Sequence, residues 1–475
     1  MASRWGWFGL VWGACFVVAC APASRGLPAA TPRPLASPDV RYCTDTVTEW
    51  EVHRCIRELT PSEQRQRGFS YRLSFDHGRL VRFVRINGRG LPFDEPGELS
   101  SDEFSYEGTR VTGWTQLNRN GVLRRRSLVA PDRIWVRWLD GSGRPFVEGT
   151  AASGLKRQLD AHGRVLSYAF VDAAGAPTRS KNGVFVVKVV RDAPGEELEE
   201  SYFDQAGQPM SNQDGVHRIV FTVNALEQPI AEGYYDRDGQ KSARNDGVAT
   251  ILNSYDAVGN VTEVRFRDLN GAPHRSKEGG AAGYRVGRDE FGSEITRTYF
   301  DESDHPVLSA FGYATRKRQL NADGLPTTWS FYAVDGTPMP VFGHEHGTQR
   351  RTLDQRNRTV LQRFFDVDER PLLLPAGYQR IETSYDARDN PILIRYANDR
   401  GAPTKLSAGY AMQLIEYDQD REVRRQYLDE SGQPTKASNG DMEIVTAFDA
   451  LGVATKRHLD HASRDPVPAA VPPSK

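Results

Sequence analysis

Two histidines and two Asp-x-Asp pairs are the residues of this sequence best suited to metal chemistry. His344 and His346 place two imidazoles on one side of an extended segment, but a catalytic metal would need a third ligand and an open position. Asp236 and Asp366 each begin an Asp-x-Asp pair, without the loop and closing glutamate of an EF-hand. The sequence has no nucleophile elbow, phosphate loop or zinc-protease motif. We therefore expect a polar loop at the histidines and no catalytic residue, metal or cofactor.

The four cysteines fall into two pairs. Cys15 and Cys20 belong to an apolar N-terminal stretch whose core runs from Trp5 to Val18, which is short for a spanning helix and typical of an export signal. Its ending, Val-Val-Ala-Cys, resembles the lipobox of bacterial lipoproteins. That resemblance implies that Cys20 becomes the acylated N-terminus and ties the protein to a membrane. An ordinary secretory signal cleaved nearby is the alternative.

Cys43 and Cys55 would remain after export. In an oxidising compartment, two cysteines in a short span predict one disulfide that closes a small loop. A metal site is the alternative because His53 lies nearby, but no further Cys or His pair completes it. The prediction is therefore a disulfide between Cys43 and Cys55.

The elements that carry these residues repeat about every 32 residues. A first turn signature, Asp-x-x-Gly-x-Pro, recurs from Asp140 to Asp460, and a second, Asp-x-x-Gly, recurs from Asp160 to Asp449. We also interpret Asn118-x-x-Gly121, in the degenerate region before Asp140, as a first signature. Asp or Asn begins such a turn by accepting hydrogen bonds from the backbone further on, and Gly at the fourth position adopts positive φ. The turn glycines include Gly143, Gly175, Gly207, Gly239, Gly259, Gly271 and Gly432. This period predicts an all-β fold, a tandem β-hairpin repeat array in an elongated, twisted or coiled sheet.

An aromatic ring lies two positions before the first Asp in nearly every unit. The ten rings are Trp138, Phe170, Tyr202, Tyr234, Phe266, Tyr299, Phe331, Phe364, Tyr396 and Tyr427. Equivalent positions of successive repeats come into register, so we expect the rings to form a structural ladder on one face of the sheet. A row of exposed platforms that stack on sugars or bases is the alternative.

Three segments carry a family resemblance: Tyr202-Phe203-Asp204-x-x-Gly207-x-Pro209, Tyr255-Asp256-x-x-Gly259-Asn260 and Tyr385-Asp386-x-x-Asp389-Asn390. They resemble the YD repeats of the rearrangement-hot-spot (RHS) family, over about residues 75–460. The resemblance implies tandem β-hairpins that coil into long sheets, which in large RHS shells enclose a C-terminal toxin. The unit of two turns is longer than the usual YD repeat.

Changes in composition and spacing divide the chain. We expect a signal peptide at 1–19, a Pro/Ala-rich tether at 20–41, an N-terminal cap with the two mature cysteines at 42–67, degenerate repeats at 68–131, regular repeats at 132–461 and a loose Pro-rich tail at 462–475. Ala21 stands where lipoproteins retained at the inner membrane of enteric Gram-negative bacteria tend to have Asp. The lipobox resemblance therefore implies a lipid-anchored protein of the outer membrane.

The balance of acidic and basic residues does not indicate a class of binding partner. The chain has 61 basic and 62 acidic residues and a formal net charge of −1, without a basic stripe for nucleic acid. We expect a non-enzymatic, surface-anchored repeat protein that acts as a scaffold or binds an envelope protein or glycan. The alternative is a hydrolase or toxin-related protein that uses the array as a carrier.

Overall fold

The computed structural model describes residues 39–461, except 45, 50–51, 56, 95–98, 148–151, 161–162, 192–196, 227, 341–346 and 450–451. Cys20, His344 and His346 lie outside the described residues, as do the predicted signal, most of the tether and the tail. None of the helices in the described part is long and apolar enough to cross a membrane.

The fold is all-β, which confirms the predicted fold class. The N-terminal elements are β1 (Asp39–Cys43), β2 (Thr46–Glu49), β3 (Val52–Cys55), α1 (Pro61–Arg65), β4 (Ser70–Asp76), β5 (Arg79–Ile86), β6 (Ser101–Glu107), β7 (Arg110–Leu117), β8 (Leu123–Val129) and β9 (Trp135–Leu139). The middle strands are β10 (Gly154–Leu159), β11 (Val165–Val171), β12 (Val186–Arg191), β13 (Glu197–Phe203), β14 (Arg218–Val223), β15 (Pro229–Tyr235), β16 (Thr250–Tyr255), β17 (Val261–Arg267), β18 (Gly283–Arg288) and β19 (Glu294–Phe300). The last strands are β20 (Thr315–Leu320), β21 (Pro326–Tyr332), β22 (Thr348–Leu353), β23 (Thr359–Phe365), β24 (Arg380–Tyr385), β25 (Pro391–Ala397), β26 (Met412–Asp418), β27 (Arg421–Leu428), β28 (Glu443–Phe448) and β29 (Ala454–Leu459).

A single antiparallel sheet contains 27 of the strands, and β2 and β3 form a separate hairpin. Strands pair in chain order from β4 onward, and β1 is added beside β4. In these registers β1 is paired with β4 and β29 with β28, so the sheet is open at both edges. The start of β1 at Asp39 corrects the predicted boundary of the tether, which extended to residue 41.

Each repeat contains a tight turn and a long connection. In the tight turn, Asp256 Oδ1 accepts hydrogen bonds from the backbone of Val258 (3.1 Å) and Asn260 (2.8 Å), and Gly259 has a φ of 89°. This is the geometry that the second signature predicts. The long connection begins with the same arrangement at Asp268 and then returns to the strand through an isolated bridge between Arg267 and Pro273.

One assignment in the degenerate region was wrong. Asn118 was interpreted as a first signature, but its turn joins β7 directly to β8 as a tight hairpin. The first signature has Pro at the position that returns to the strand, whereas Leu123 occupies that position here and begins β8. The long connection is therefore missing, which explains why fewer residues separate Asn118 from Asp140 than separate successive first signatures in the regular repeats.

The ten predicted rings lie on one face of the sheet, which we call the ring face. Seven of them are buried: Trp138, Tyr202, Tyr234, Phe266, Tyr299, Phe331 and Phe364. Each repeat contributes two strands, so another strand separates successive rings; Tyr234, for example, is opposite Ile219. Direct ring-on-ring stacking along the whole array is therefore not the arrangement that forms.

Intervening residues connect the rings instead. In the second half of the sheet three of them are tyrosines, Tyr313, Tyr378 and Tyr410. Tyr410, for example, lies 6.1 Å from Tyr396 and 4.7 Å from Tyr427, between ring centroids. In the first half the corresponding position holds buried aliphatic residues such as Val216 and Val248, within the main hydrophobic cluster. The row is thus aromatic at one end and mixed at the other.

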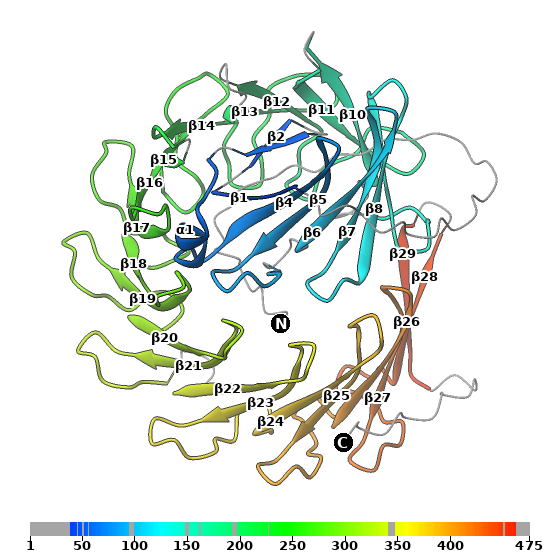
Figure 1. The fold of residues 1–475 in the computed structure, drawn as a ribbon. Helices are drawn as coiled ribbons and strands as arrows, with labels where there is room; N and C mark the ends of the chain where they lie inside the picture. Colours follow the sequence, from blue (N-terminus) through cyan, green and yellow to red (C-terminus); the bar gives the residue numbers. More distant parts are fainter. Residues whose placement is uncertain are drawn as a thin grey trace.

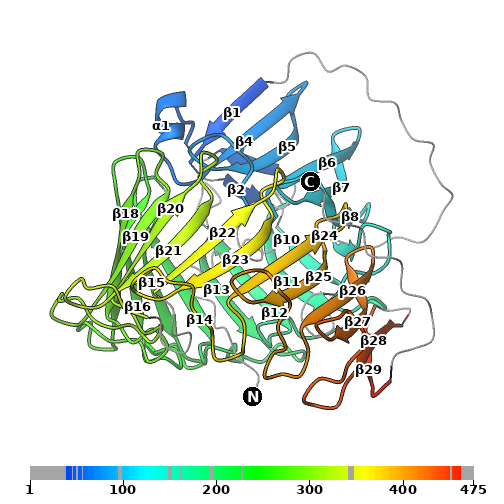
Figure 2. The same cartoon turned by 90° about the horizontal axis from the view of Figure 1, so that it is seen from below.

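The sheet bends round in space. In Figure 1 the strands follow one another around the molecule, and Figure 2 gives the view from below. As a result the last strands return to the first ones: Arg421 on β27 donates a hydrogen bond to the carbonyl of Pro145, 276 residues earlier. This return positions the site described next.

Candidate functional site: the turn seam

The predicted mature cysteines are joined. Cys43 ends β1 and Cys55 ends β3, and a disulfide connects them with their Cα atoms 5.5 Å apart. Cys43 is fully buried and packs with Tyr71, Leu73 and Phe83. The disulfide therefore ties the small hairpin β2–β3 to the edge of the large sheet.

The turn residues are used within their own turns. All seven predicted turn glycines have positive φ: Gly143 (87°), Gly175 (86°), Gly207 (79°), Gly239 (77°), Gly259 (89°), Gly271 (81°) and Gly432 (79°). In the Asp-x-Asp pair at Asp236, one carboxylate oxygen accepts from the backbone of Asp238 (3.0 Å) and Gln240 (2.8 Å). Within the described ranges, no group of three or more His, Cys, Asp or Glu side chains is placed to hold a metal ion.

Turns that are far apart in the sequence meet along a line that we call the turn seam. One side comprises the N-terminal segments 65–68, 87–91, 118–124 and 140–145; the other comprises the turns at 256–260, 289–293, 321–324, 354–358, 386–390 and 418–421. The N-terminal hairpins are thereby clamped onto six consecutive turns of the repeat array.

The seam begins beside α1. The backbone amide of Gly68 donates to Asn260 Oδ1 (2.9 Å), and Asn260 Nδ2 donates to the carbonyl of Gln66 (2.9 Å). One turn further, Arg89 forms an ion pair with Asp289 (3.1 Å) and lies 4.2 Å from the ring centroid of Phe291. These contacts pair backbone groups and charges of the first hairpins with the repeat turns.

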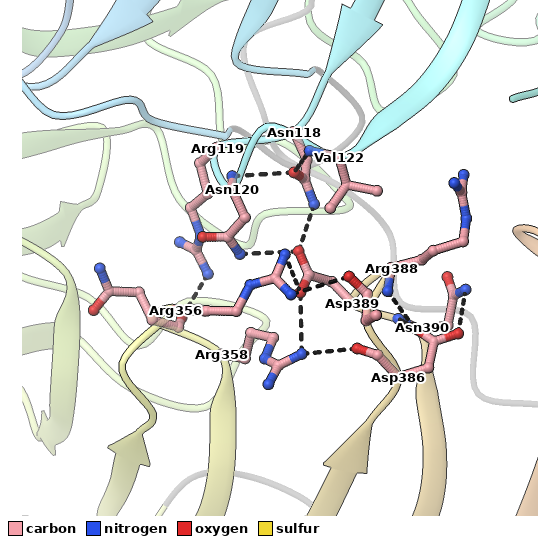
Figure 3. Close-up of polar contacts among 12 residues, drawn as sticks. Asn118, Arg119, Asn120, Val122, Arg356, Arg358, Asp386, Arg388, Asp389 and Asn390 are labelled. Carbon is pink, nitrogen blue, oxygen red and sulfur yellow. Dashed lines mark hydrogen bonds and ion pairs between the residues drawn. The ribbon is translucent and has the colours of Figure 1, made fainter.

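Asp389 is the centre of the seam (Figure 3). Its Oδ2 accepts hydrogen bonds from Asn118 Nδ2 (2.8 Å) and Asn120 Nδ2 (2.9 Å). Its Oδ1 lies 3.1 Å from a guanidinium nitrogen of Arg356 and 3.1 Å from one of Arg358. The carboxylate thus has four partners from two other turns, and its side chain is only 7% exposed.

The electrostatics favour the ionised carboxylate. Burial alone would raise the pKa of Asp389, but the hydrogen bonds from Asn120 and Asn118 and the positive charges of Arg356 and Arg358 outweigh burial and lower it. Charge-assisted hydrogen bonds of this kind are stronger than neutral ones. The site can therefore hold turns together, and its charged groups are paired with one another.

The far end of the seam follows the same scheme. Asp420 accepts from Arg124 (2.7 Å) and from Arg388 (2.7 Å) on separate carboxylate oxygens. Arg421 forms an ion pair with the buried carboxylate of Asp140 (3.1 Å). Asp140 also caps its own turn, so one residue serves both the repeat and the seam.

One residue of the sequence signals this site. Asp389 occupies the fourth position of its turn, where the signature has Gly, and it keeps a positive φ of 64°. A non-glycine residue at positive φ is uncommon, so its side chain can be inspected for a role. Asn357 (φ 61°) is a second case in the seam, because its side chain donates to Asp323 (2.9 Å) and its carbonyl accepts from Arg119.

Comparisons with known proteins find only distant structural similarity. No family model matches it, and no curated protein sequence matches it. Among solved structures it is similar to a chain of the Photorhabdus luminescens Tc holotoxin pore, with 11% identity, a TM-score of 0.35 and coverage of 82% of this chain and 21% of that one. It is also similar to TcdB2–TccC3 without its hypervariable C-terminal region (14% identity, TM-score 0.25, 83% and 21% covered) and to a porin-like protein from Bacteroides uniformis (10%, 0.20, 68% and 94%). The chain spans about a fifth of the length of the two toxin-complex chains. The description as a β-repeat protein accordingly rests on the strand pairing given above.

Proposed function

We propose that this chain is a non-enzymatic scaffold of the cell envelope, held there by a lipid on Cys20, which binds an envelope protein or glycan. One observation carries the scaffold part of the proposal: the repeated polar residues are used to build the fold. The turn acids cap their own turns, and the charges of the turn seam pair with one another. A repeat array of this kind builds a long surface by stacking copies of one short unit.

The anchor is supported by the order of the N-terminal features. An apolar run ends in Val-Ala-Cys20, and a Pro/Ala-rich spacer follows. The first described strand, β1, begins at Asp39. An extended spacer of about 3 Å per residue would hold the sheet away from the membrane surface. Ala21 after the lipidated cysteine favours the outer membrane.

Membrane fractionation tests the anchor. Cys20→Ala should release the protein from membrane pellets and abolish labelling with a fatty acid. Cys15→Ala is the matched control, because it removes a cysteine from the same apolar run and should leave both unchanged. Continued pelleting and labelling of Cys20→Ala would contradict the proposal.

Affinity capture tests the binding role against the carrier alternative. Full-length protein is incubated with envelope extracts, and retained polysaccharide and protein are identified and then titrated individually. Saturable binding without turnover supports the scaffold. A hydrolytic activity that is lost in His344→Ala would support the carrier or hydrolase class instead.

A further inference from the structure

The arginines on the ring face are not required by the repeat. The fourth residue of the first strand of each hairpin points to this face. From β10 to β24 it is Arg157, Val189, Phe221, Asn253, Val286, Arg318, Arg351 and Thr383. The hairpin therefore forms equally with apolar or small polar residues at this position. Arg157 donates to the carbonyl of Arg133, whereas Arg318 and Arg351 need another explanation.

Four guanidinium groups gather on β19–β22. Arg297 and Arg316 are directly opposite in the register, and Arg318 is opposite Trp329. Arg351 lies over the ring of Trp329, 4.2 Å from its centroid. We call Arg297, Arg316, Arg318 and Arg351 the arginine cluster. Like charges directly opposite on a sheet are destabilising, so the arrangement costs stability unless anions offset it.

The cluster has one internal anion. Glu294 lies 2.7 Å from Arg297 and 2.6 Å from Arg316, but 3.6 Å from Arg318. The Nε atoms of all four arginines are buried without a hydrogen-bond partner among the described residues. Arg351 has neither an ion pair nor a hydrogen bond within the described part of the chain. Among the described residues, the Glu294 carboxylate therefore pairs closely with Arg297 and Arg316, forms only a long ion pair with Arg318, and forms none with Arg351.

The two remaining arginines are desolvated yet reachable. Burial lowers the pKa of Arg318 to about 10 and also lowers the pKa of Arg351. The Arg318 side chain is still 22% exposed, so a ligand can approach it from solvent. Cation–π contact with Trp329 holds the guanidinium of Arg351 in place and leaves its donors available.

Two amide side chains extend the polar surface. Gln349 is opposite Trp329 in the register, and Gln362 is opposite Arg351. Both are half-buried and have no hydrogen-bond partner among the residues described. Amides beside guanidinium groups and an indole suit a ligand with hydroxyls as well as carboxylates.

We propose that the arginine cluster binds the carboxylates of an acidic polysaccharide. The inference rests on the proposed binding role and names the ligand class for it. Glu294 shows the fit, because its carboxylate already bridges two of these arginines; a carboxylate of the ligand takes Arg318 and Arg351 in the same way. From β19 to β22 there are three interstrand steps, about 14 Å, which suits a short stretch of glycan.

The same face argues against a long nucleic acid. Glu200 and Glu232 occupy the ring face on β13 and β15, each accepting a hydrogen bond from the neighbouring Tyr202 or Tyr234. Their carboxylates would repel a phosphate backbone that continued beyond the cluster. The basic surface is short, and acids lie on the same face at β13 and β15, unlike a continuous nucleic-acid track.

Calorimetric titration of the full chain with polygalacturonate tests the inference. Arg318→Val with Arg351→Thr introduces residues that other repeats already hold at these positions. Lys317→Val is the matched control, because Lys317 is adjacent in sequence but faces the opposite side, over Tyr332. The double variant should lose about tenfold or more in affinity, whereas the control and the wild type should agree within about twofold. If the double variant does not fold, Arg351→Thr alone is compared with the wild type and with Lys317→Val. This single variant breaks no ion pair among the described residues.

The outcomes separate this inference from the proposed function. Equal affinity of the double variant and the wild type would overturn the site. Duplex DNA that displaces polygalacturonate at equal concentration of charge would also overturn it, in favour of a general polyanion surface. Failure to bind polygalacturonate, together with saturable binding of a neutral glycan or a protein, would reject the acidic ligand and leave the scaffold role. Absence of any envelope ligand would reject both.

Discussion

Replacing Asp389 by glycine should weaken the turn seam while relaxing its backbone. The variant removes a buried carboxylate that has four partners: Asn118, Asn120, Arg356 and Arg358. Breaking a buried ion pair from one side costs about 3–5 kcal/mol. Glycine relieves the positive φ, worth about 1–2 kcal/mol, but adds about 0.5–1 kcal/mol of chain entropy. The expected net loss in free energy of unfolding is about 2–4 kcal/mol.

The assay is urea unfolding combined with amide hydrogen exchange. Faster exchange should appear at 118–122 and at 386–390, the two segments that Asp389 joins. His77→Gly is the matched control, because His77 has a φ of 48° and an 89% exposed side chain outside the seam. Besides the backbone change, it removes only the exposed contact between His77 and Asp76 (2.8 Å), and it should differ from the wild type by about 1 kcal/mol or less. Asp389→Gly behaving like His77→Gly would refute a stabilising role for the seam.

The same variant predicts a pH dependence. The folded pKa of Asp389 is lowered relative to the unfolded chain, so its contribution is fully present above the ordinary value near 4. It is lost as the pH falls through the folded pKa. The difference in stability between the wild type and Asp389→Gly should therefore be largest near neutral pH and shrink below about pH 4. A difference that stayed constant down to pH 2 would contradict this assignment.

Three further variants test other parts of the fold. Tyr234→Ala removes a ring that is only 1% exposed and should cost about 3–5 kcal/mol, measured by urea unfolding; a loss below about 1 kcal/mol would mean that the ring row does not support the sheet. Gly259→Val should destabilise more than Gly271→Val, because both have positive φ but only Gly259 would bring a Cβ to within 2.4 Å of other side chains; equal melting temperatures would contradict the close approach. Cys43→Ser with Cys55→Ser should cost about 3 kcal/mol, and a double variant as stable as the wild type would show that the disulfide contributes nothing.

The repeat could be predicted from the sequence because its determinants are local. Asp236 and Gly239 are three residues apart, and the hydrogen bonds that define their turn involve only the intervening backbone. The same reasoning predicted the hairpin architecture. The disulfide followed separately, from the two cysteines that remain after the predicted export signal. It failed at Asn118, where the signature was incomplete and Leu123 replaced the proline that opens the long connection.

The turn seam could not be predicted in the same way. Asn118 and Asp389 are 271 residues apart, and their meeting depends on how far the whole sheet bends. Local patterns do not specify that bend, because small changes in strand twist accumulate over many strands. The direct ring ladder was wrong for a related reason: a unit of two strands places Ile219 between successive rings.

A distance between two turns tests the seam most directly. Leu91 and Glu290 are exposed residues on neighbouring turns of the seam, where Arg89 and Asp289 are 3.1 Å apart. In a straight array, β5 and β18 would be thirteen strands apart, or about 60 Å. Spin labels on Leu91→Cys and Glu290→Cys, measured by pulsed electron paramagnetic resonance, should report a separation less than half of that value. A separation near the straight-array value would show that the sheet does not return on itself.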